Sequence, residues 1–225
     1  MLSFNNVEFA YPNQTVFTDL SFDLGSDEFC FLIGKSGSGK STLLQLIYMN
    51  LFPLSGSVQV GEYNSRTIKK RELPFLRRKL GVVFQDYKLF QDRNISDNLS
   101  FILEATGTPR KEIKKRVINA LSEVGLSHRI RSKPNELSGG EKQRIAIARA
   151  IINNPILILA DEPTGNLDPE TSYEIVELFR KINSRGTAVL FATHNYEIVK
   201  KYDAKIIKIE NGKAYKGVLK QKTEV

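Results

Sequence analysis

Long hydrophobic runs are missing from this sequence of 225 residues. The longest uninterrupted apolar stretches, such as Ile156–Ala160, are far shorter than the roughly 20 residues that a membrane-spanning helix needs. The amino terminus, MLSFNNVEF, has neither the basic start nor the apolar block of a secretory signal. The sequence therefore predicts a protein that stays in the cytoplasm and has no membrane span of its own.

Cysteine is nearly absent as well, since Cys30 is the only one in the chain. A single cysteine excludes an internal disulfide, and its place in an apolar stretch predicts a packing role rather than a reactive one. With 41% hydrophobic and 26% charged residues, the composition argues against a disordered chain. It is typical of one compact unit of one or two lobes with a real core.

Acidic residues are in the minority, with 25 Asp and Glu against 33 Lys and Arg and a net charge of +8. The basic residues gather in clusters at 69–71, 77–79 and 110–116, and in a lysine-rich tail from 200 to 222. Aromatic residues are not interleaved with these lysines, so we expect no nucleic acid partner. A solvated surface is the ordinary explanation of such clusters, and contact with an anionic membrane surface stays open beside it.

The stretch at 34–42, GKSGSGKST, fits the phosphate-binding pattern G-x-x-x-x-G-K-[ST]. An apolar strand pattern at 28–33 precedes it and a helical pattern at 41–48 follows, which is the order that the motif requires. We expect Lys40 over the β- and γ-phosphates of a nucleotide and Ser41 on Mg²⁺. Tyr11, at a turn upstream, is placed to stack on the base. The residues predicted to bind phosphate are Gly34, Lys35, Ser36, Gly37, Ser38, Gly39, Lys40, Ser41 and Thr42.

The rest of the chain reads as an α/β protein. A small antiparallel sheet is expected near the amino terminus, helical lobes in the middle, and apolar strands alternating with helices towards the end. The expected strands are 2–9, 16–24, 28–33, 57–60, 80–84, 156–160, 188–192, 204–209 and 214–218. The expected helical stretches are 41–48, 66–79 with an interruption at Pro74, 95–106, 109–124, 141–152 and 170–183.

Four apolar strands are each followed by polar residues that can take part in binding or catalysis. They lead into the phosphate loop, Gln85, the pair Asp161 and Glu162, and His194. Because ligands bind at the carboxyl edge of a parallel sheet, we expect these residues to meet there. Asp161 is placed to hold Mg²⁺, Glu162 to orient or deprotonate a water, and His194 to reach the γ-phosphate. Gln85 is placed to contact Mg²⁺ or that water.

A second glycine-bearing helix start follows at Ser138-Gly139-Gly140-Glu141. One nucleotide cannot fill both glycine sites of one chain, so a head-to-tail homodimer is expected, in which each Ser138 loop covers the nucleotide of its partner. The alternative is an ordinary helix cap with Ser138 as the N-cap residue.

Taken in order, these motifs resemble those of the ATP-binding cassette (ABC) ATPases along the whole chain: GKSGSGKST (34–42), Gln85, LSGGEKQR (137–144), ILILADE (156–162), GNLD (165–168) and His194. The resemblance implies a P-loop NTPase fold with a parallel-sheet core, an antiparallel β subdomain and an inserted helical subdomain. It implies ATP as the nucleotide with Tyr11 on adenine, Glu162 as catalytic base and His194 as switch histidine. It also implies a signature loop at 138–141 and a dimer-contact loop at 166–168.

The implied organisation is a single domain over residues 1–225. Residues 1–85 and 155–225 form the nucleotide-binding core with the β subdomain, and residues 86–154 form the helical subdomain. Asn195 departs from the family, in which aspartate often follows the switch histidine.

Within the family, ADEPTGNLD resembles the branch of lipoprotein-release, macrolide-efflux and cell-division ATPases. The stretches 43–58 and 73–107 favour the cell-division type. That resemblance implies an integral membrane partner like FtsX, regulation of septal peptidoglycan hydrolases, and a peripheral place on the inner face of the cell membrane. We expect Tyr87–Phe90, with Leu89 and Phe90 exposed, to receive a helix of the partner.

Two alternatives remain at this stage. A lipoprotein-release or efflux ATPase has the same catalytic motifs. A soluble ABC ATPase acting on nucleic acid is disfavoured, because the interval 42–137 has no room for a coiled coil and the cassette is not in tandem.

Overall fold

The structure is a computed structural model, and it describes residues 1–217. The strands are β1 (Leu2–Tyr11), β2 (Gln14–Leu24), β3 (Phe29–Ile33), β4 (Ser55–Val60), β5 (Tyr63–Asn64), β6 (Leu80–Val83), β7 (Leu157–Asp161), β8 (Ala188–Thr193), β9 (Lys205–Glu210) and β10 (Lys213–Gly217). The α-helices are α1 (Lys40–Ile47), α2 (Leu73–Arg78), α3 (Ile95–Ala105), α4 (Arg110–Glu123), α5 (Gly139–Ile151), α6 (Pro169–Asn183) and α7 (Tyr196–Lys200). Short 3₁₀ turns lie at Lys70–Glu72, Ser127–Arg129 and Pro134–Glu136.

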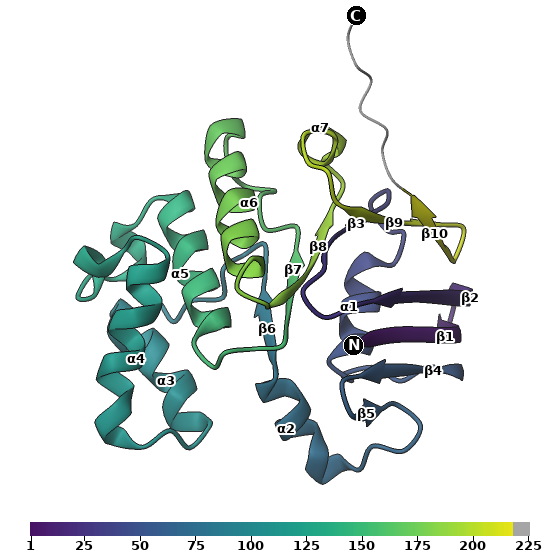
Figure 1. The fold of residues 1–225 in the computed structure, drawn as a ribbon, viewed down its shortest axis with the longest axis horizontal. Coiled ribbons are helices and arrows are strands. Elements are labelled where there is room, and N and C mark those ends of the chain that lie inside the picture. The colour runs from purple at the N-terminus through teal and green to yellow at the C-terminus, as the bar shows by residue number, and fades with distance from the viewer. Residues whose placement is uncertain (218–225) are drawn as a thin grey trace, which may run out of the picture.

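Within residues 1–217 the strands form two sheets (Figure 1). The larger has the order β10-β9-β3-β8-β7-β6, and its pairs from β9 to β6 are parallel, while β10 adds an antiparallel edge. The smaller is antiparallel with the order β2-β1-β4-β5. The expected fold class, a parallel α/β core with an antiparallel β subdomain and a helical insertion, is confirmed.

The central strands are buried on both faces, and their side chains alternate between two cores. Along β3, Cys30 and Leu32 pack with α1 and the antiparallel sheet, whereas Phe31 and Ile33 pack with α6 and the other helices. The same alternation continues through β7 and β8. A strand covered on both faces has no polar side, which explains apolar runs such as ILILA.

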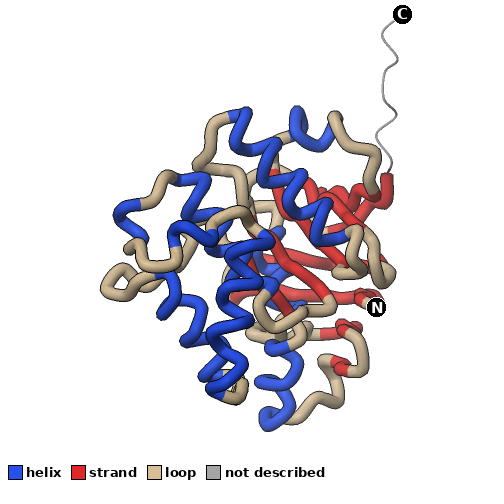
Figure 2. The backbone as a smooth tube through the Cα atoms, turned by 60° about the vertical axis from the view of Figure 1, so that its left-hand side comes forward, coloured by secondary structure: helices blue, strands red, loops and turns tan. Residues whose placement is uncertain are grey.

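Helices α3, α4 and α5 pack on one another on one side of the larger sheet (Figure 1). The tube in Figure 2 shows the strands gathered on one side of the molecule and most helices on the other. Gly107 and Gly125, which follow α3 and α4, have φ of 80° and 76°. They end their helices because glycine adopts this left-handed conformation without a steric cost.

Three local expectations need correction. The helical stretch 66–79 is shortened to a 3₁₀ turn and α2, and Pro74 lies in the first turn of α2 instead of interrupting a helix. Proline suits that position, since a first-turn N–H has no intrahelical partner. Helix α5 begins at Gly139, earlier than expected, and α7 was not expected at all. The predicted strand end at Val218 and the tail beyond residue 217 lie outside the described residues.

Between residues 1 and 217, no helix combines the length and the apolar character that crossing a bilayer would take.

Candidate functional site

Four neighbouring parallel strands, in the order β3, β8, β7 and β6, end at the same edge of the larger sheet. The phosphate loop follows β3, and His194 follows β8, which ends at Thr193. Strand β7 ends at Asp161, and Gln85 lies just beyond β6. The strand ends thus meet at one edge, as the sequence predicted.

The loop between β3 and α1 depends on glycine at two positions. Gly39, the residue before α1, has a φ of 100°, and a Cβ there would lie 2.7 Å from Val16 Cγ1. A Cβ on Gly34 would lie 2.4 Å from Ser38 Oγ and 2.9 Å from the carbonyl oxygen of Ile209. The backbone can therefore pass close to its neighbours and present its N–H groups in front of α1, as phosphate binding requires.

Lys40 fills the centre of this loop, with a side chain that is 7% exposed. Its ammonium donates to the carbonyl oxygen of Gly34 at 2.9 Å and to that of Lys35 at 3.4 Å. The same nitrogen lies 3.2 Å from Glu162 Oε1. A largely buried cation is thus held between the loop backbone and a carboxylate.

Glu162 joins this lysine to His194. Its Oε2 accepts a hydrogen bond from the backbone N–H of His194 at 3.2 Å and lies 3.0 Å from His194 Nδ1. The carboxylate is 14% exposed, while the imidazole is 61% exposed. Glu162 has a φ of 47°, and its own N–H donates to the carbonyl oxygen of Ala192, which anchors this left-handed turn to β8. Such backbone strain is common at functional sites.

Asp161 has a buried carboxylate oxygen that is free to bind a cation. Burial raises the pKa of its carboxyl, and a hydrogen bond with Ser41 opposes that rise, while the charge of Glu162 adds to it. Oδ1 of Asp161 is buried without a hydrogen-bond partner among the described residues. A desolvated carboxylate oxygen beside a hydroxyl fits a hard cation such as Mg²⁺.

No group of three or more His, Cys, Asp or Glu side chains forms a metal site within residues 1–217. A Mg²⁺ ion that shares its ligands with phosphate does not need one, because one or two protein oxygens suffice.

Gln85 and Tyr11 make contacts that the sequence did not foresee. The side-chain amide of Gln85 donates to Asn166 Oδ1 at 3.4 Å, and Asn166 Nδ2 donates to the backbone carbonyl oxygen of Gln85 at 3.3 Å. The Tyr11 hydroxyl lies 3.3 Å from Thr42 Oγ1, and its ring meets Phe9 edge-on with centroids 5.1 Å apart. Tyr11 is 39% exposed and lies beside the phosphate loop.

The stretch 138–141 begins α5 as a capping box. Ser138 Oγ accepts from the N–H of Glu141 at 3.2 Å, and Glu141 Oε2 accepts from the N–H of Ser138 at 2.9 Å. Arg129 donates to the other oxygen of Glu141 at 2.8 Å. These bonds, led by that from the Ser138 backbone, lower the pKa of Glu141. The helix-cap interpretation of Ser138 therefore holds within one chain.

The exposed side of this cap opens into a hollow of about 330 Å³, lined by residues 138–141 and by the loop 166–168. None of the described lining residues belongs to the phosphate loop. The phosphate loop and the start of α5 thus line separate hollows of the chain.

Some contacts around the site were not predicted from the sequence. Asn195 caps α7 by accepting from the N–H groups of Glu197 and Ile198 at 3.1 and 3.2 Å. Asn98 is fully buried and binds the backbone of Phe90. A polar residue on an apolar helical face was the available signal for Asn98.

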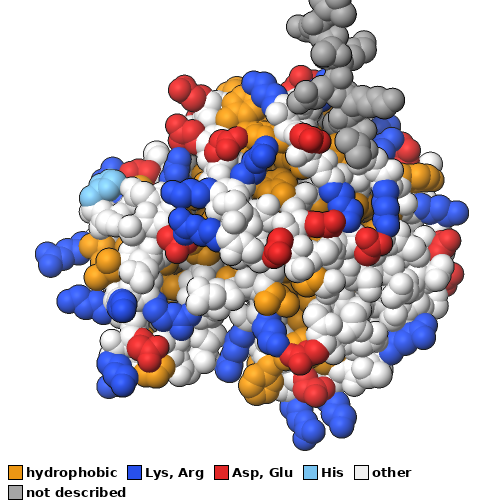
Figure 3. Space-filling model, in the orientation of Figure 1, with side chains coloured by type: hydrophobic (Ala, Val, Ile, Leu, Met, Phe, Trp, Pro, Cys, Tyr) orange, Lys and Arg blue, Asp and Glu red, His pale blue; other side chains and the backbone are white. Residues whose placement is uncertain are grey.

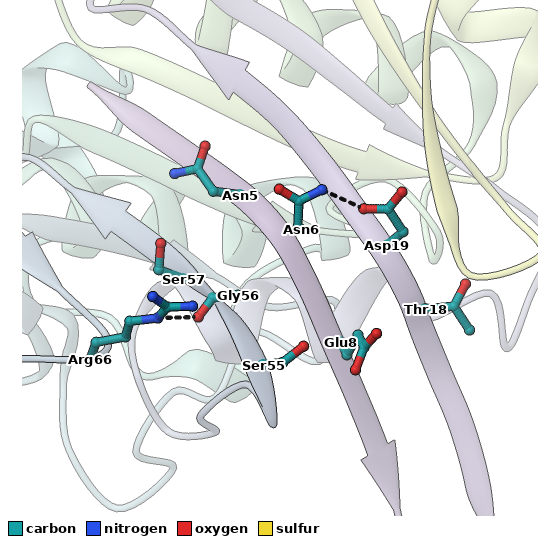
Figure 4. Close-up of a pocket in the computed structure, with 9 residues that line it drawn as sticks. All are labelled: Asn5, Asn6, Glu8, Thr18, Asp19, Ser55, Gly56, Ser57 and Arg66. Carbon is teal, nitrogen blue, oxygen red and sulfur yellow. Dashed lines mark hydrogen bonds between the residues drawn. The ribbon is translucent and has the colours of Figure 1, made fainter.

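A different hollow, on the solvent side of the antiparallel sheet, is separate from this edge (Figure 4). Two hydrogen bonds join its lining residues: Asn6 donates to Asp19 at 2.8 Å, and Arg66 donates to the backbone carbonyl oxygen of Gly56 at 2.8 Å. None of its described lining residues has a buried side-chain polar atom without a hydrogen-bond partner, in contrast to Asp161, so the candidate site remains at the strand ends.

Residues 17–165 match the sequence profile of the ABC transporter family. Among curated proteins, the chain is 49% identical over 199 residues to the cell division ATP-binding protein FtsE of Streptococcus pneumoniae, covering 88% of this chain and 86% of that one. It is 46% identical to the FtsE protein of Bacillus subtilis, covering 94% and 93%. It is 40% identical to that of Escherichia coli, covering 97% and 99%.

Solved structures agree with these similarities. The dimeric ATP-binding cassette MJ0796 bound to ADP and Pi superposes with a TM-score of 0.83 and 32% identity, covering 98% of this chain and 99% of that one. CbiO1 from Clostridium perfringens, part of an ABC transporter complex, gives a TM-score of 0.89 at 29% identity, covering 96% and 87%. Family profile, relatives and fold lead to one conclusion: the chain belongs to the ABC transporter family of ATPases.

Proposed function

We propose that this protein is the ATP-binding and ATP-hydrolysing subunit of a membrane complex that acts in bacterial cell division, as its FtsE relatives are named to do. The main support for ATP hydrolysis is the position of the Glu162 carboxylate, which lies within 3.2 Å of both Lys40 and His194. Identity of 40% to 49% to FtsE proteins over most of the chain supports the cellular process.

In this proposal the loop 34–42 binds the ATP phosphates, and Tyr11 stacks on adenine. Lys40 offsets the phosphate charge, and Glu162 is the catalytic base that accepts a proton from the attacking water. His194 orients the γ-phosphate. The buried position of Glu162 supports this role, because a carboxylate shielded from solvent interacts more strongly with nearby charges.

The residues present fit a Mg²⁺ ion. Ser41 and Asp161 would hold it, with Gln85 as a further oxygen ligand after release from Asn166. When bound, Mg²⁺ neutralises charge on the β- and γ-phosphates. The partnerless Oδ1 of Asp161 beside the Ser41 hydroxyl supports this assignment.

A head-to-tail homodimer completes the proposed site, with residues 138–141 of each chain over the nucleotide of the other. The dimeric MJ0796 cassette, of similar fold, supports this arrangement. The cap at Ser138 is compatible with it, since the first turn of α5 still directs its free N–H groups outward. We further propose that residues 86–154 act as a helical subdomain against a core made of residues 1–85 and 155–225.

The membrane partner is proposed to resemble FtsX and to dock on the loop at 87–90. One part of the expectation is wrong: Leu89 is 7% exposed and belongs to the core. Phe90 is 38% exposed, packs edge-on against Phe101, and has the Arg93 guanidinium 5.0 Å from its ring centre. An aromatic ring with a stacked arginine is typical of interface hot spots.

Replacing that ring tests the docking proposal. Phe90→Ala is expected to reduce partner co-purification, whereas Tyr215→Ala, at an aromatic ring on the edge strand β10 that is 48% exposed, leaves it intact. Unchanged co-purification of the Phe90 variant would remove the loop from the interface.

Lys and Arg side chains gather at the left edge of the molecule, where α4 lies, and at the bottom, below α2 (Figure 3). We propose that these clusters face the anionic inner leaflet beside the partner, which gives the protein a peripheral place on the cytoplasmic side of the cell membrane. Salt-dependent binding to anionic vesicles by the partner-free chain tests this point, and no binding at low salt would refute it.

The deciding experiment is purification of the Glu162→Gln protein with ATP from detergent-solubilised membranes of its own host. Recovery of an FtsX-like partner together with division and peptidoglycan factors would support the proposal. A lipoprotein-release or efflux permease would reassign the protein to that branch of the family, and recovery of nucleic acid without a permease would point to a soluble role.

A further inference from the structure

The loop that follows Gln85 is strained. Tyr87 and Lys88 are consecutive non-glycine residues with φ of 59° and 47°, in the left-handed region. This conformation costs roughly 1–2 kcal/mol per residue, so it persists only where neighbouring contacts enforce it. The loop is therefore held by specific partners.

Arg149 of α5 supplies the main restraint. Its guanidinium donates through Nη2 to the carbonyl oxygen of Tyr87 at 2.8 Å and through Nη1 to that of Lys88. Burial lowers the pKa of Arg149, and the negative charge of Asp86 in the same loop opposes this effect. One rigid fork thus captures both strained residues, which a single point charge cannot do with the same geometry.

Tyr87 also reaches the opposite end of the same helix. A Cβ on Gly139, the first residue of α5, would lie 3.3 Å from the Tyr87 hydroxyl. Arg149 and Gly139 are ten residues apart on α5, which corresponds to about 15 Å along the axis. The loop is therefore hydrogen-bonded to α5 through Arg149 and packs beside the first residue of the same helix through the Tyr87 ring.

The far end of the loop has its own anchor. The buried amide of Asn98 accepts from the N–H of Phe90 at 2.8 Å and donates to the carbonyl oxygen of Phe90 at 3.0 Å. The near end is joined to the 166–168 loop through Gln85 and Asn166. Hydrogen bonds to Asn166, Arg149 and Asn98 therefore hold the segment from Gln85, near the end of β6, to the exposed ring of Phe90.

We propose that Arg149 is a positioning residue that fastens the 85–90 loop to α5, so that a displacement of the loop by a docked partner moves Ser138–Gly140 at the start of that helix. The transmission step rests on the proposed function, because it needs a partner on the loop. The fastening itself is a property of the single chain and can be tested alone.

Arg116 provides a matched control. Its guanidinium also binds backbone next to α5, donating to the carbonyl oxygen of Ile152 at 2.6 Å, but it does not touch the 85–90 loop. Arg116→Met and Arg149→Met each remove one charge; the first leaves the carbonyl of Ile152 without this donor, and the second leaves those of Tyr87 and Lys88 without theirs. Arg149→Lys is the conservative variant, which keeps the charge and loses the fork.

The first measurement is hydrogen exchange on the full chain without partner. Arg149→Met should speed amide exchange in residues 86–90 at least tenfold, Arg149→Lys should give an intermediate effect, and Arg116→Met should leave this segment unchanged. Equal exchange in wild type and Arg149→Met, or an equal increase in Arg116→Met, would overturn the fastening.

The second measurement is ATP turnover by the complex with the membrane partner. Arg149→Met is expected to lower the partner-stimulated kcat at least tenfold with KM for ATP within about twofold, while Arg116→Met retains stimulation at equal folded fraction. Full stimulation in Arg149→Met with faster loop exchange would refute transmission and leave the partner assignment intact. If the wild-type chain has no membrane partner, the proposed function and the transmission both fail, and the exchange result still decides the fastening.

Discussion

Replacing Glu162 by glutamine is the sharpest test of the catalytic proposal. The substitution keeps the shape of the side chain and removes its charge and its ability to accept a proton. In the folded chain this carboxylate is 14% exposed, with Lys40 at 3.2 Å and His194 at 3.0 Å. Its neighbours are thus within contact distance, and the amide of glutamine can still occupy the same space.

We expect Glu162→Gln to lose roughly 10²- to 10⁴-fold in turnover, the usual contribution of a general base. This loss corresponds to about 2.7 to 5.5 kcal/mol of transition-state stabilisation. ATP affinity should not weaken, because the substitution removes the carboxylate that competes with phosphate for the Lys40 side chain. The variant should therefore bind ATP and fail to hydrolyse it.

Phosphate release measures turnover, and titration with a fluorescent ATP analogue measures affinity. Glu62→Gln is the matched control, since Glu62 pairs with Lys79 on the surface with 66% exposure and lies outside the site. Turnover of Glu162→Gln at the wild-type level would show that another group activates the water. Loss of ATP binding in this variant would show instead that the carboxylate organises the phosphate loop.

Three further predictions concern other positions. Ser138→Arg should leave ATP binding by the monomer intact and abolish ATP-driven dimerisation in a Glu162→Gln background, measured by light scattering; a normal dimer would contradict the trans site. Because burial raises the pKa of Asp161, the unfolded chain releases this proton first, and stability falls as pH rises from the ordinary aspartate value of 3.8 towards the folded one. Asp161→Asn should therefore raise Tm at neutral pH, by roughly 2–4 °C for each kcal/mol regained, while losing Mg²⁺-dependent turnover; an unchanged or lower Tm would refute the desolvation argument. Burial raises the pKa of the Cys30 thiol to about 12, so a thiol reagent should label it only in denaturant, and rapid labelling of the folded chain would refute its burial.

The sequence by itself determined the features that are local. The phosphate loop was identified because a glycine pattern, a preceding strand and a following helix are contiguous in the chain. The central strands were identified because burial on both faces leaves an apolar run, as in 156–160. Because parallel strands place their carboxyl ends at one edge, the sequence also predicted that Gln85, Asp161 and His194 lie on neighbouring strand ends.

Contacts between distant segments were decided only by the tertiary structure. No local pattern indicated that Glu162 would lie between Lys40 and His194, or that Gln85 would bond Asn166. Nor did any pattern indicate that Leu89 would be buried while its neighbour Phe90 is not. Arg149 had no motif of its own, and its role follows from two backbone carbonyls that lie 61 and 62 residues away. A periodic pattern records which face of an element is buried, whereas a side chain's partner depends on how separate elements pack, and that packing is fixed by the whole core.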